Sequence, residues 1–148
     1  MPKALLKKTL EKRTKMKFFI AQRVTGEDKD ELTEESKRIA SILEASKHEV
    51  YCTMFVDIKE FEKQTKKAMM EHAFKEIGNS DALLVIVRTE EKSEGMLMEV
   101  GYALGKKKKI VLLIKNEVKN TYLRELADKV LEFKDVDDLH NKLKKLKI

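Results

Sequence analysis

The segment from Asp81 to Val87 limits the fold more than any other part of the sequence, because after its first residue it contains only Ala, Leu, Val and Ile. A strand with apolar side chains on both faces belongs inside a parallel sheet that is covered by helices on both sides. Other segments with strand composition lie at 17–21, 48–55, 110–114 and 131–133. Helical patterns cover 32–43, 61–77, 95–104 and about 120–130, and a last one begins at Asp135. This alternation predicts an α/β fold, a flavodoxin-like doubly wound sheet of five parallel strands in the order 2-1-3-4-5 with helices on both faces.

The positive charge of the chain is concentrated at its beginning. The formal net charge of the 148 residues is +6, and residues 1–17 alone hold seven basic groups against one acidic residue, Glu11. We therefore expect a basic N-terminal arm over residues 1–16 and a single α/β domain over residues 17–148. Nucleic-acid proteins usually carry their charge on a folded face, so this distribution makes a nucleic-acid partner unlikely.

The remaining composition argues against several other classes of protein. One cysteine, Cys52, cannot form an internal disulfide, and the three histidines are too far apart to define a metal site by their spacing. No apolar stretch approaches the roughly 18 residues that a membrane-spanning helix needs. We expect a cytoplasmic protein with neither a metal nor another cofactor and no membrane association.

The two loops that follow the first and third strands are the expected binding region. In a doubly wound sheet, ligands bind beyond the carboxyl ends of the strands where the strand order reverses. The loops there are 22–30 and 88–95, and the second ends directly before a helix, whose N-terminus favours anions. The residues that suit a phosphate are Gln22, Arg23, Gly26, Ser93 and Gly95. The alternative interpretation is that Ser93 is an ordinary helix cap and Arg23 a solvated loop residue.

Glu99 is the strongest candidate for a reactive group. It is the sole ionisable residue between Gly95 and Leu104, in a segment that otherwise offers a helix no polar face. Burial of an unpaired carboxylate costs several kcal/mol, so such a residue indicates a reaction or a ligand. The alternatives are exposure at the mouth of a site or a pairing at a subunit interface. Gly101 in the same helix indicates close packing against the sheet or a partner.

The run from Asp81 to Ile114, with the core Ser93-Glu-Gly-Met-Leu-Met-Glu-Val-Gly-Tyr-Ala-Leu-Gly105, resembles the nucleoside 2-deoxyribosyltransferase superfamily, which includes 2′-deoxynucleoside 5′-monophosphate N-glycosidases. The resemblance implies that Glu99 is the nucleophile on the anomeric carbon. It also implies that Ser93, which stands where the transferases carry Asp, binds the 5′-phosphate. A serine donates a hydrogen bond to a phosphate dianion, whereas an aspartate repels it.

The resemblance therefore predicts hydrolysis of the N-glycosidic bond of 2′-deoxynucleoside 5′-monophosphates through a covalent glycosyl-glutamate, in a homodimer that binds a deoxynucleotide or deoxynucleoside. Two positions depart from the family pattern. Phe18 stands for a tyrosine of the first strand and Ala73 for an aspartate, with Glu71 and His72 beside it as candidate acids. The alternatives are a nucleoside 2-deoxyribosyltransferase and a non-catalytic nucleotide-binding module.

Overall fold

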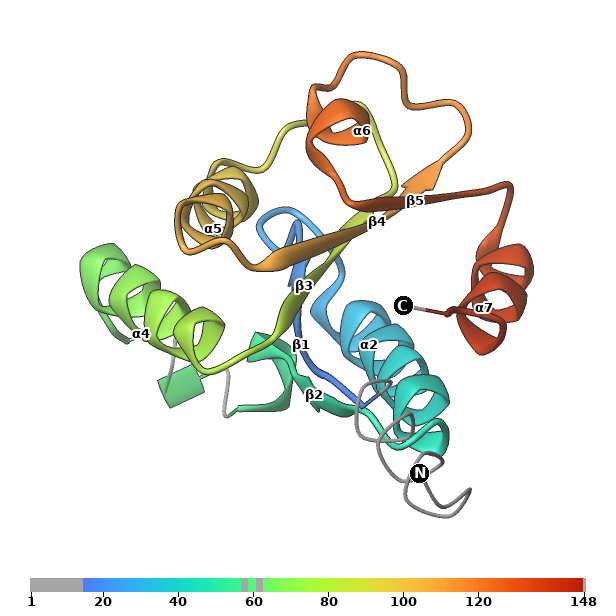
Figure 1. Ribbon diagram of the computed structural model, residues 1–148. Coiled ribbons are helices and arrows are strands. Elements are labelled where there is room, and N and C mark those ends of the chain that lie inside the picture. Colours follow the sequence, from blue (N-terminus) through green and yellow to red (C-terminus); the bar gives the residue numbers. More distant parts are fainter. Residues whose placement is uncertain (1–14, 57–58, 61–62, 148) are drawn as a thin grey trace, which may run out of the picture.

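The computed structural model describes residues 15–56, 59–60 and 63–147, and the basic arm of residues 1–16 lies almost wholly outside this range. Five parallel strands form one sheet in the order β2-β1-β3-β4-β5 (Figure 1). The strands are β1 (Lys17–Gln22), β2 (Glu49–Tyr51), β3 (Ala82–Val87), β4 (Lys109–Lys115) and β5 (Lys129–Phe133). The predicted fold class and strand order are thus confirmed.

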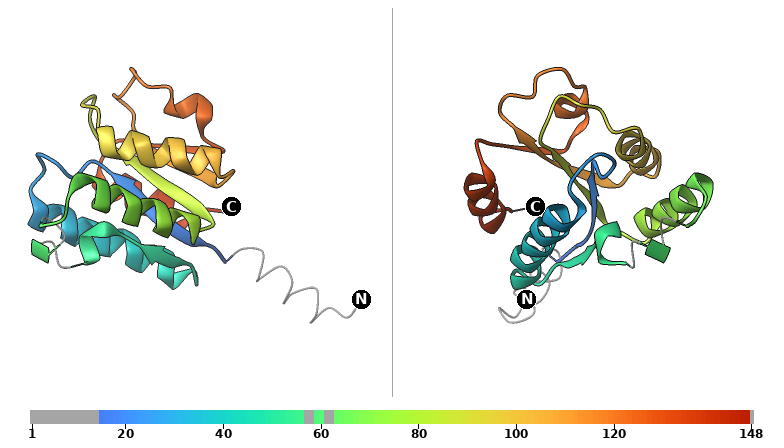
Figure 2. Two further views of the ribbon diagram at one scale, coloured as in Figure 1. Left: turned by 90° about the vertical axis from the view of Figure 1, so that its left-hand side faces the viewer. Right: turned by 180° about the vertical axis from the view of Figure 1, so that it is seen from behind.

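The helices cover both faces of the sheet. They are α2 (Lys29–Ala45), α4 (Lys66–Gly78), α5 (Glu94–Gly105), α6 (Leu123–Leu126) and α7 (Val136–Lys144), and a 3₁₀ turn, η1 (Thr53–Phe55), follows β2. Helices α2 and α7 pack on one face, while α4, α5 and α6 pack on the other. Figure 2 shows α4 and α5 side by side, with α2 across the sheet from them. The site residues on α5 therefore lie on the face that α4 also covers.

Side chains at the helix starts explain where the helices begin. Asp28 accepts a hydrogen bond from the backbone N–H of Glu31 at the start of α2, and Thr65 does the same for Ala68 at the start of α4. Such caps satisfy N–H groups that have no acceptor within the helix. Of the predicted helix 61–77, the structure shows α4 from Lys66 onward, and residues 61–62 lie outside the described residues.

Two predicted elements are shorter in the structure. The strand expected over 48–55 ends at Tyr51, and the chain then turns through η1, which buries Met54. The helix expected over about 120–130 is the single turn α6, because the backbone of Ala127 is extended and leads into β5. After Tyr51 the mainly apolar composition continues to Val56, so composition alone did not mark the end of β2.

Alternation along β1 sends neighbouring side chains to opposite faces of the sheet. Phe18 and Ile20 belong to the core beneath α2 and α7, whereas Phe19 and Ala21 belong to the core beneath α4 and α5. All four are buried. Phe18, the position compared above with a tyrosine, thus lies on the face away from α5.

Candidate active site

Ser93 fixes the start of α5. Its hydroxyl oxygen accepts a hydrogen bond of 3.2 Å from the backbone N–H of Met96, and the backbone of Ser93 itself is extended. The N–H groups of a first helical turn have no acceptors within the helix and carry the positive end of its dipole. Ser93 is partly buried, and its hydroxyl hydrogen remains available to an acceptor. The residue is a helix cap that can also bind an anion.

The two loops expected to form the site come together through Arg23. Its guanidinium lies 2.7 Å from a carboxylate oxygen of Glu27 in its own loop and 2.7 Å from one of Glu91 in the loop after β3. Gly26 has φ of 85°, and a Cβ atom there would lie 3.0 Å from the guanidinium. A side chain at position 26 would therefore strain the turn that lies against Arg23.

A third loop holds the segment before Ser93 in place. The carboxylate of Glu90 accepts hydrogen bonds from the backbone N–H groups of Lys119, at 2.7 Å, and Asn120, at 3.3 Å. The ammonium group of Lys92 donates to the backbone carbonyl of Asn120. These contacts connect the loop after β3 with the loop after β4. The position of Ser93 thus depends on residues of the same chain about thirty positions away.

Glu99 lies in the packing between α5 and α4. One turn before it, the position of a Cβ on Gly95 would be 4.0 Å from the sulfur of Met70, and three residues after it, Tyr102 stacks on Phe74 with ring centroids 4.5 Å apart. Glu99 has no hydrogen bond and no ion pair within the part of the chain that the structure describes. Desolvation raises the pKa of its carboxyl from 4.5 to about 8.

The carboxyl of Glu99 therefore releases its proton near neutral pH, far above the usual range for glutamate. A carboxyl in such surroundings can act as a nucleophile or transfer a proton at neutral pH. The sequence predicted that this helix would offer Glu99 no polar face, and the apolar packing around Glu99 agrees with that prediction.

The other candidate acids lie on α4. Glu71 is exposed and forms an ion pair of 3.9 Å with Lys67. His72 is also exposed, and its Nε2 lies 2.8 Å from the phenol oxygen of Tyr51 at the end of β2. Ala73 is buried in the core and offers no polar group. Of these three neighbours, His72 is the one joined to a residue of the sheet, Tyr51 at the end of β2.

Gln22 lies on the opposite face of the sheet from Glu99. Its amide nitrogen donates to the hydroxyl of Ser36 at 2.7 Å, and its amide oxygen accepts from Arg88 at 3.0 Å. Arg88 also pairs with Glu35 at 3.0 Å. With 6% of its surface exposed, Gln22 holds a buried polar network under α2. A ligand beside Ser93 could contact Gln22 only if it disrupted this network of hydrogen bonds.

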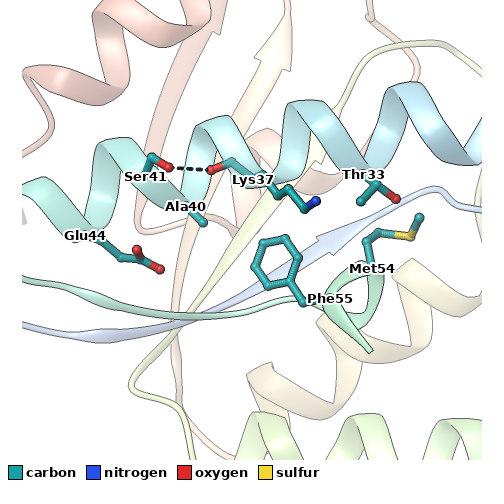
Figure 3. Close-up of a pocket in the computed structure, with 7 residues that line it drawn as sticks. All are labelled: Thr33, Lys37, Ala40, Ser41, Glu44, Met54 and Phe55. Carbon is teal, nitrogen blue, oxygen red and sulfur yellow. Dashed lines mark hydrogen bonds between the residues drawn. The ribbon is translucent and has the colours of Figure 1, made fainter. Parts of the chain in front are cut away.

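The hollows in the described residues are modest near Ser93 and larger elsewhere. A space of about 20 Å³ lies between Arg23, Arg88, Glu91 and Met96, with room for about one water molecule. A more open hollow of about 460 Å³ lies between α2 and η1 (Figure 3). Its lining residues, Thr33, Lys37, Ala40, Ser41, Glu44, Met54 and Phe55, include none of the predicted site residues. The larger of these two hollows thus lies away from the predicted site.

The described residues contain no group of three or more His, Cys, Asp or Glu side chains arranged to hold a metal ion. None of the described helices is long and apolar enough to cross a membrane.

The sequence matches the family model for nucleoside 2-deoxyribosyltransferase over residues 21–138, which include both loops, Ser93 and Glu99. The chain belongs to the nucleoside 2-deoxyribosyltransferase family. No protein with a curated function matches the sequence.

Solved structures with the same fold include a CMP N-glycosidase and a 2-deoxyribosyltransferase. The CMP N-glycosidase BcmB of Clostridium botulinum is 17% identical, with a TM-score of 0.64 over 86% of this chain and 96% of that one. A 2-deoxyribosyltransferase of Bacillus psychrosaccharolyticus is 16% identical, with a TM-score of 0.57 over 84% and 90% of the two chains. A conserved protein of Enterococcus faecalis V583 is 15% identical, with a TM-score of 0.60 over 87% and 97%. At these identities the likeness is one of fold.

Sequence reasoning about this family member missed Tyr51 and Glu91. Tyr51 ends a strand that was expected to continue to residue 55, so nothing marked it as an edge residue of the sheet. Glu91 belongs to a charged loop with the composition of a solvent-exposed segment, yet it pairs with Arg23. The signal available for Glu91 was its position in the loop between the buried strand β3 and the glycine-containing start of α5.

Proposed function

We propose that this protein hydrolyses the N-glycosidic bond of 2′-deoxynucleoside 5′-monophosphates, with Glu99 as the nucleophile. The observation that carries the proposal is the unpaired carboxyl of Glu99 in apolar packing, six residues along α5 from the Ser93 cap. That separation is about 9 Å along a helix, which a deoxyribose 5-phosphate can bridge. The phosphate binds at the helix start and presents its sugar to the carboxyl.

The reaction follows the pattern of a retaining glycosidase. Ionised Glu99 attacks C1′, the C1′–N bond breaks through an oxocarbenium-like transition state, and the bonding electrons leave with the base, which takes up a proton. Water then cleaves the deoxyribosyl ester, which yields 2-deoxyribose 5-phosphate and restores the carboxylate. Apolar packing that disfavours the free carboxylate makes it a stronger nucleophile toward a cationic sugar centre.

The phosphate contacts come from the two loops. Ser93 can donate a hydrogen bond, the first turn of α5 presents its N–H groups, and Arg23 supplies a cation once Glu27 or Glu91 gives way. The CMP N-glycosidase among the similar structures supports a nucleotide as substrate. The 2-deoxyribosyltransferase supports the rival reaction, in which a second base replaces water.

The same proposal includes a homodimer formed through α5. Leu97 and Met98 are 40% and 44% exposed, and a Cβ atom at Gly101 would meet nothing within 4 Å. These residues share one side of the helix, away from the sheet. The packing of Gly101 against the sheet that the sequence suggested is therefore wrong, and a partner is the remaining explanation. Met98→Lys should shift a dimer to monomer in analytical ultracentrifugation.

The test is a substrate panel. Purified protein is incubated with the four deoxynucleoside monophosphates, CMP and the matching deoxynucleosides, with and without a second free base, and free base and sugar phosphate are measured by chromatography. We expect base release from monophosphates that is lost in Glu99→Ala and kept in Glu125→Gln, an exposed residue of α6 outside the proposed site. Base exchange on nucleosides would favour the transferase. Binding of a monophosphate without release of its base would favour the non-catalytic nucleotide-binding module.

A further inference from the structure

Tyr51 and His72 form a polar pair beside Glu99 that the reaction described above does not use. Tyr51 is the last residue of β2, and its phenol oxygen is 2.8 Å from Nε2 of His72 on α4. The ring of Tyr51 also stacks on Phe19, with centroids 5.4 Å apart and planes at 21°. The phenol is therefore held in one orientation at the end of β2, level with the middle of β1 and on the face of the sheet that α5 covers.

The pair and Glu99 share one electrostatic environment. The pKa of Tyr51 is raised to about 12 by burial first, and then by the charges of Glu76, Cys52 and Glu99. Glu99 thus acts on Tyr51 from α5, as Glu76 does from α4. The stacking of Phe74 on Tyr102 holds these two helices together around the three groups. For His72 to reach the leaving base, a base attached to a sugar at Glu99 must lie between α5 and this pair.

The hydrogen bond determines how protons are distributed. A phenol with such a high pKa keeps its proton at neutral pH, so it donates to Nε2 of a neutral His72, and the ring proton then resides on Nδ1. When His72 is protonated, its Nε2–H donates to the phenol oxygen instead. In both states Tyr51 orients the ring, and His72, which is exposed on α4, presents an N–H group.

We infer that His72 donates the proton to the departing base and that Tyr51 positions it for this transfer. The inference rests on the proposed function. As the C1′–N bond breaks, its electron pair moves to the base nitrogen, and that nitrogen takes a proton from the imidazolium form of His72, which leaves the ring neutral. The water that later cleaves the glycosyl ester gives its oxygen to the sugar and its proton back to His72. General acids of this kind accelerate reactions by about 10²- to 10⁴-fold.

The experiment compares two leaving groups. One substrate is 2′-deoxyguanosine 5′-monophosphate. The other is its 7-methyl derivative, whose base carries a positive charge and leaves without a proton. The variants are His72→Gln, Tyr51→Phe, the double variant, and Lys75→Gln as an exposed control on α4. Tyr51→Phe keeps an aromatic ring on Phe19, and His72 is exposed, so both variants should fold; melting curves check this.

We expect His72→Gln to slow release of the unmodified base by about 10²-fold or more and Tyr51→Phe by about 10-fold. The double variant should be no slower than His72→Gln, because Tyr51 acts through His72. All variants should release the methylated base at nearly the wild-type rate. Equal losses on both substrates, or none on either, would overturn the inference alone. A wild-type protein that releases neither base would overturn the proposed function and the inference with it.

Discussion

Replacement of Glu99 by glutamine tests whether the carboxyl is as strongly desolvated as its packing implies. The folded protein holds the Glu99 proton up to about pH 8, whereas the ordinary pKa is 4.5. Between these values the folded state binds one proton more than the unfolded state, so stability falls as the pH rises. A glutamine side chain resembles the protonated acid in shape and has no proton to lose.

The magnitude follows from the same pKa values. Each pH unit in this window changes the free energy of unfolding by about 1.4 kcal/mol. The glutamine variant should therefore be more stable than wild type by about 1 kcal/mol at pH 5 and about 3 kcal/mol at pH 7. For a chain of this length, the second difference corresponds to a rise in Tm of about 6–12 °C.

The assay is urea unfolding of both proteins at pH 5, 6 and 7, with equal m-values required before the free energies are compared. Glu94→Gln is the matched control, because Glu94 lies exposed in the first turn of the same helix, and it should change stability by less than about 0.5 kcal/mol at each pH. A difference between Glu99→Gln and wild type that stays constant from pH 5 to pH 7 would refute the desolvated carboxyl.

Four further predictions concern the loops, the buried network and the arm. Ser93→Ala should lose about 1 kcal/mol of stability, because it removes the helix cap. Ser93→Asp should keep the cap but weaken binding of a deoxynucleoside monophosphate far more than binding of the nucleoside, as measured by calorimetry. Equal weakening of both ligands would mean that the phosphate does not bind at this position. Glu91→Gln should tighten binding of the same monophosphate several-fold, because one of the two carboxylates on Arg23 loses its charge; unchanged affinity would mean that Arg23 does not bind the phosphate. Gln22→Leu should destabilise the protein by about 1–3 kcal/mol, because Ser36 and Arg88 lose their hydrogen bonds to Gln22. Urea unfolding that shows no loss of stability would contradict this prediction. Deletion of residues 1–15 should change Tm by less than about 2 °C, because the apolar pattern begins only at Phe18; a larger drop would make the arm part of the fold.

The sequence by itself determined the architecture and singled out Glu99, whose carboxyl the structure places in apolar packing. The fully apolar run at Ala82–Val87 requires cover on both faces, and its alternation with helical patterns leaves few ways to arrange five strands. Glu99 was identifiable because it is the only acidic or basic residue in the segment 95–104, where a helix offers a carboxylate no polar face. Ser93 was identifiable because a serine before a glycine-containing helix start is a cap. These are local patterns, so they are readable without a fold.

Tertiary structure alone decided which side chains meet. Phe18 and Phe19 are both apolar, so nothing in their order tells which one faces α5, and the same uncertainty hid that Gln22 points toward α2. Tyr51 and His72 are twenty-one residues apart, and they touch because α4 crosses beside the end of β2. Contacts of this kind depend on the twist of the sheet and the packing of whole helices. No local pattern in a sequence encodes them, because the physical cause lies in elements distant along the chain.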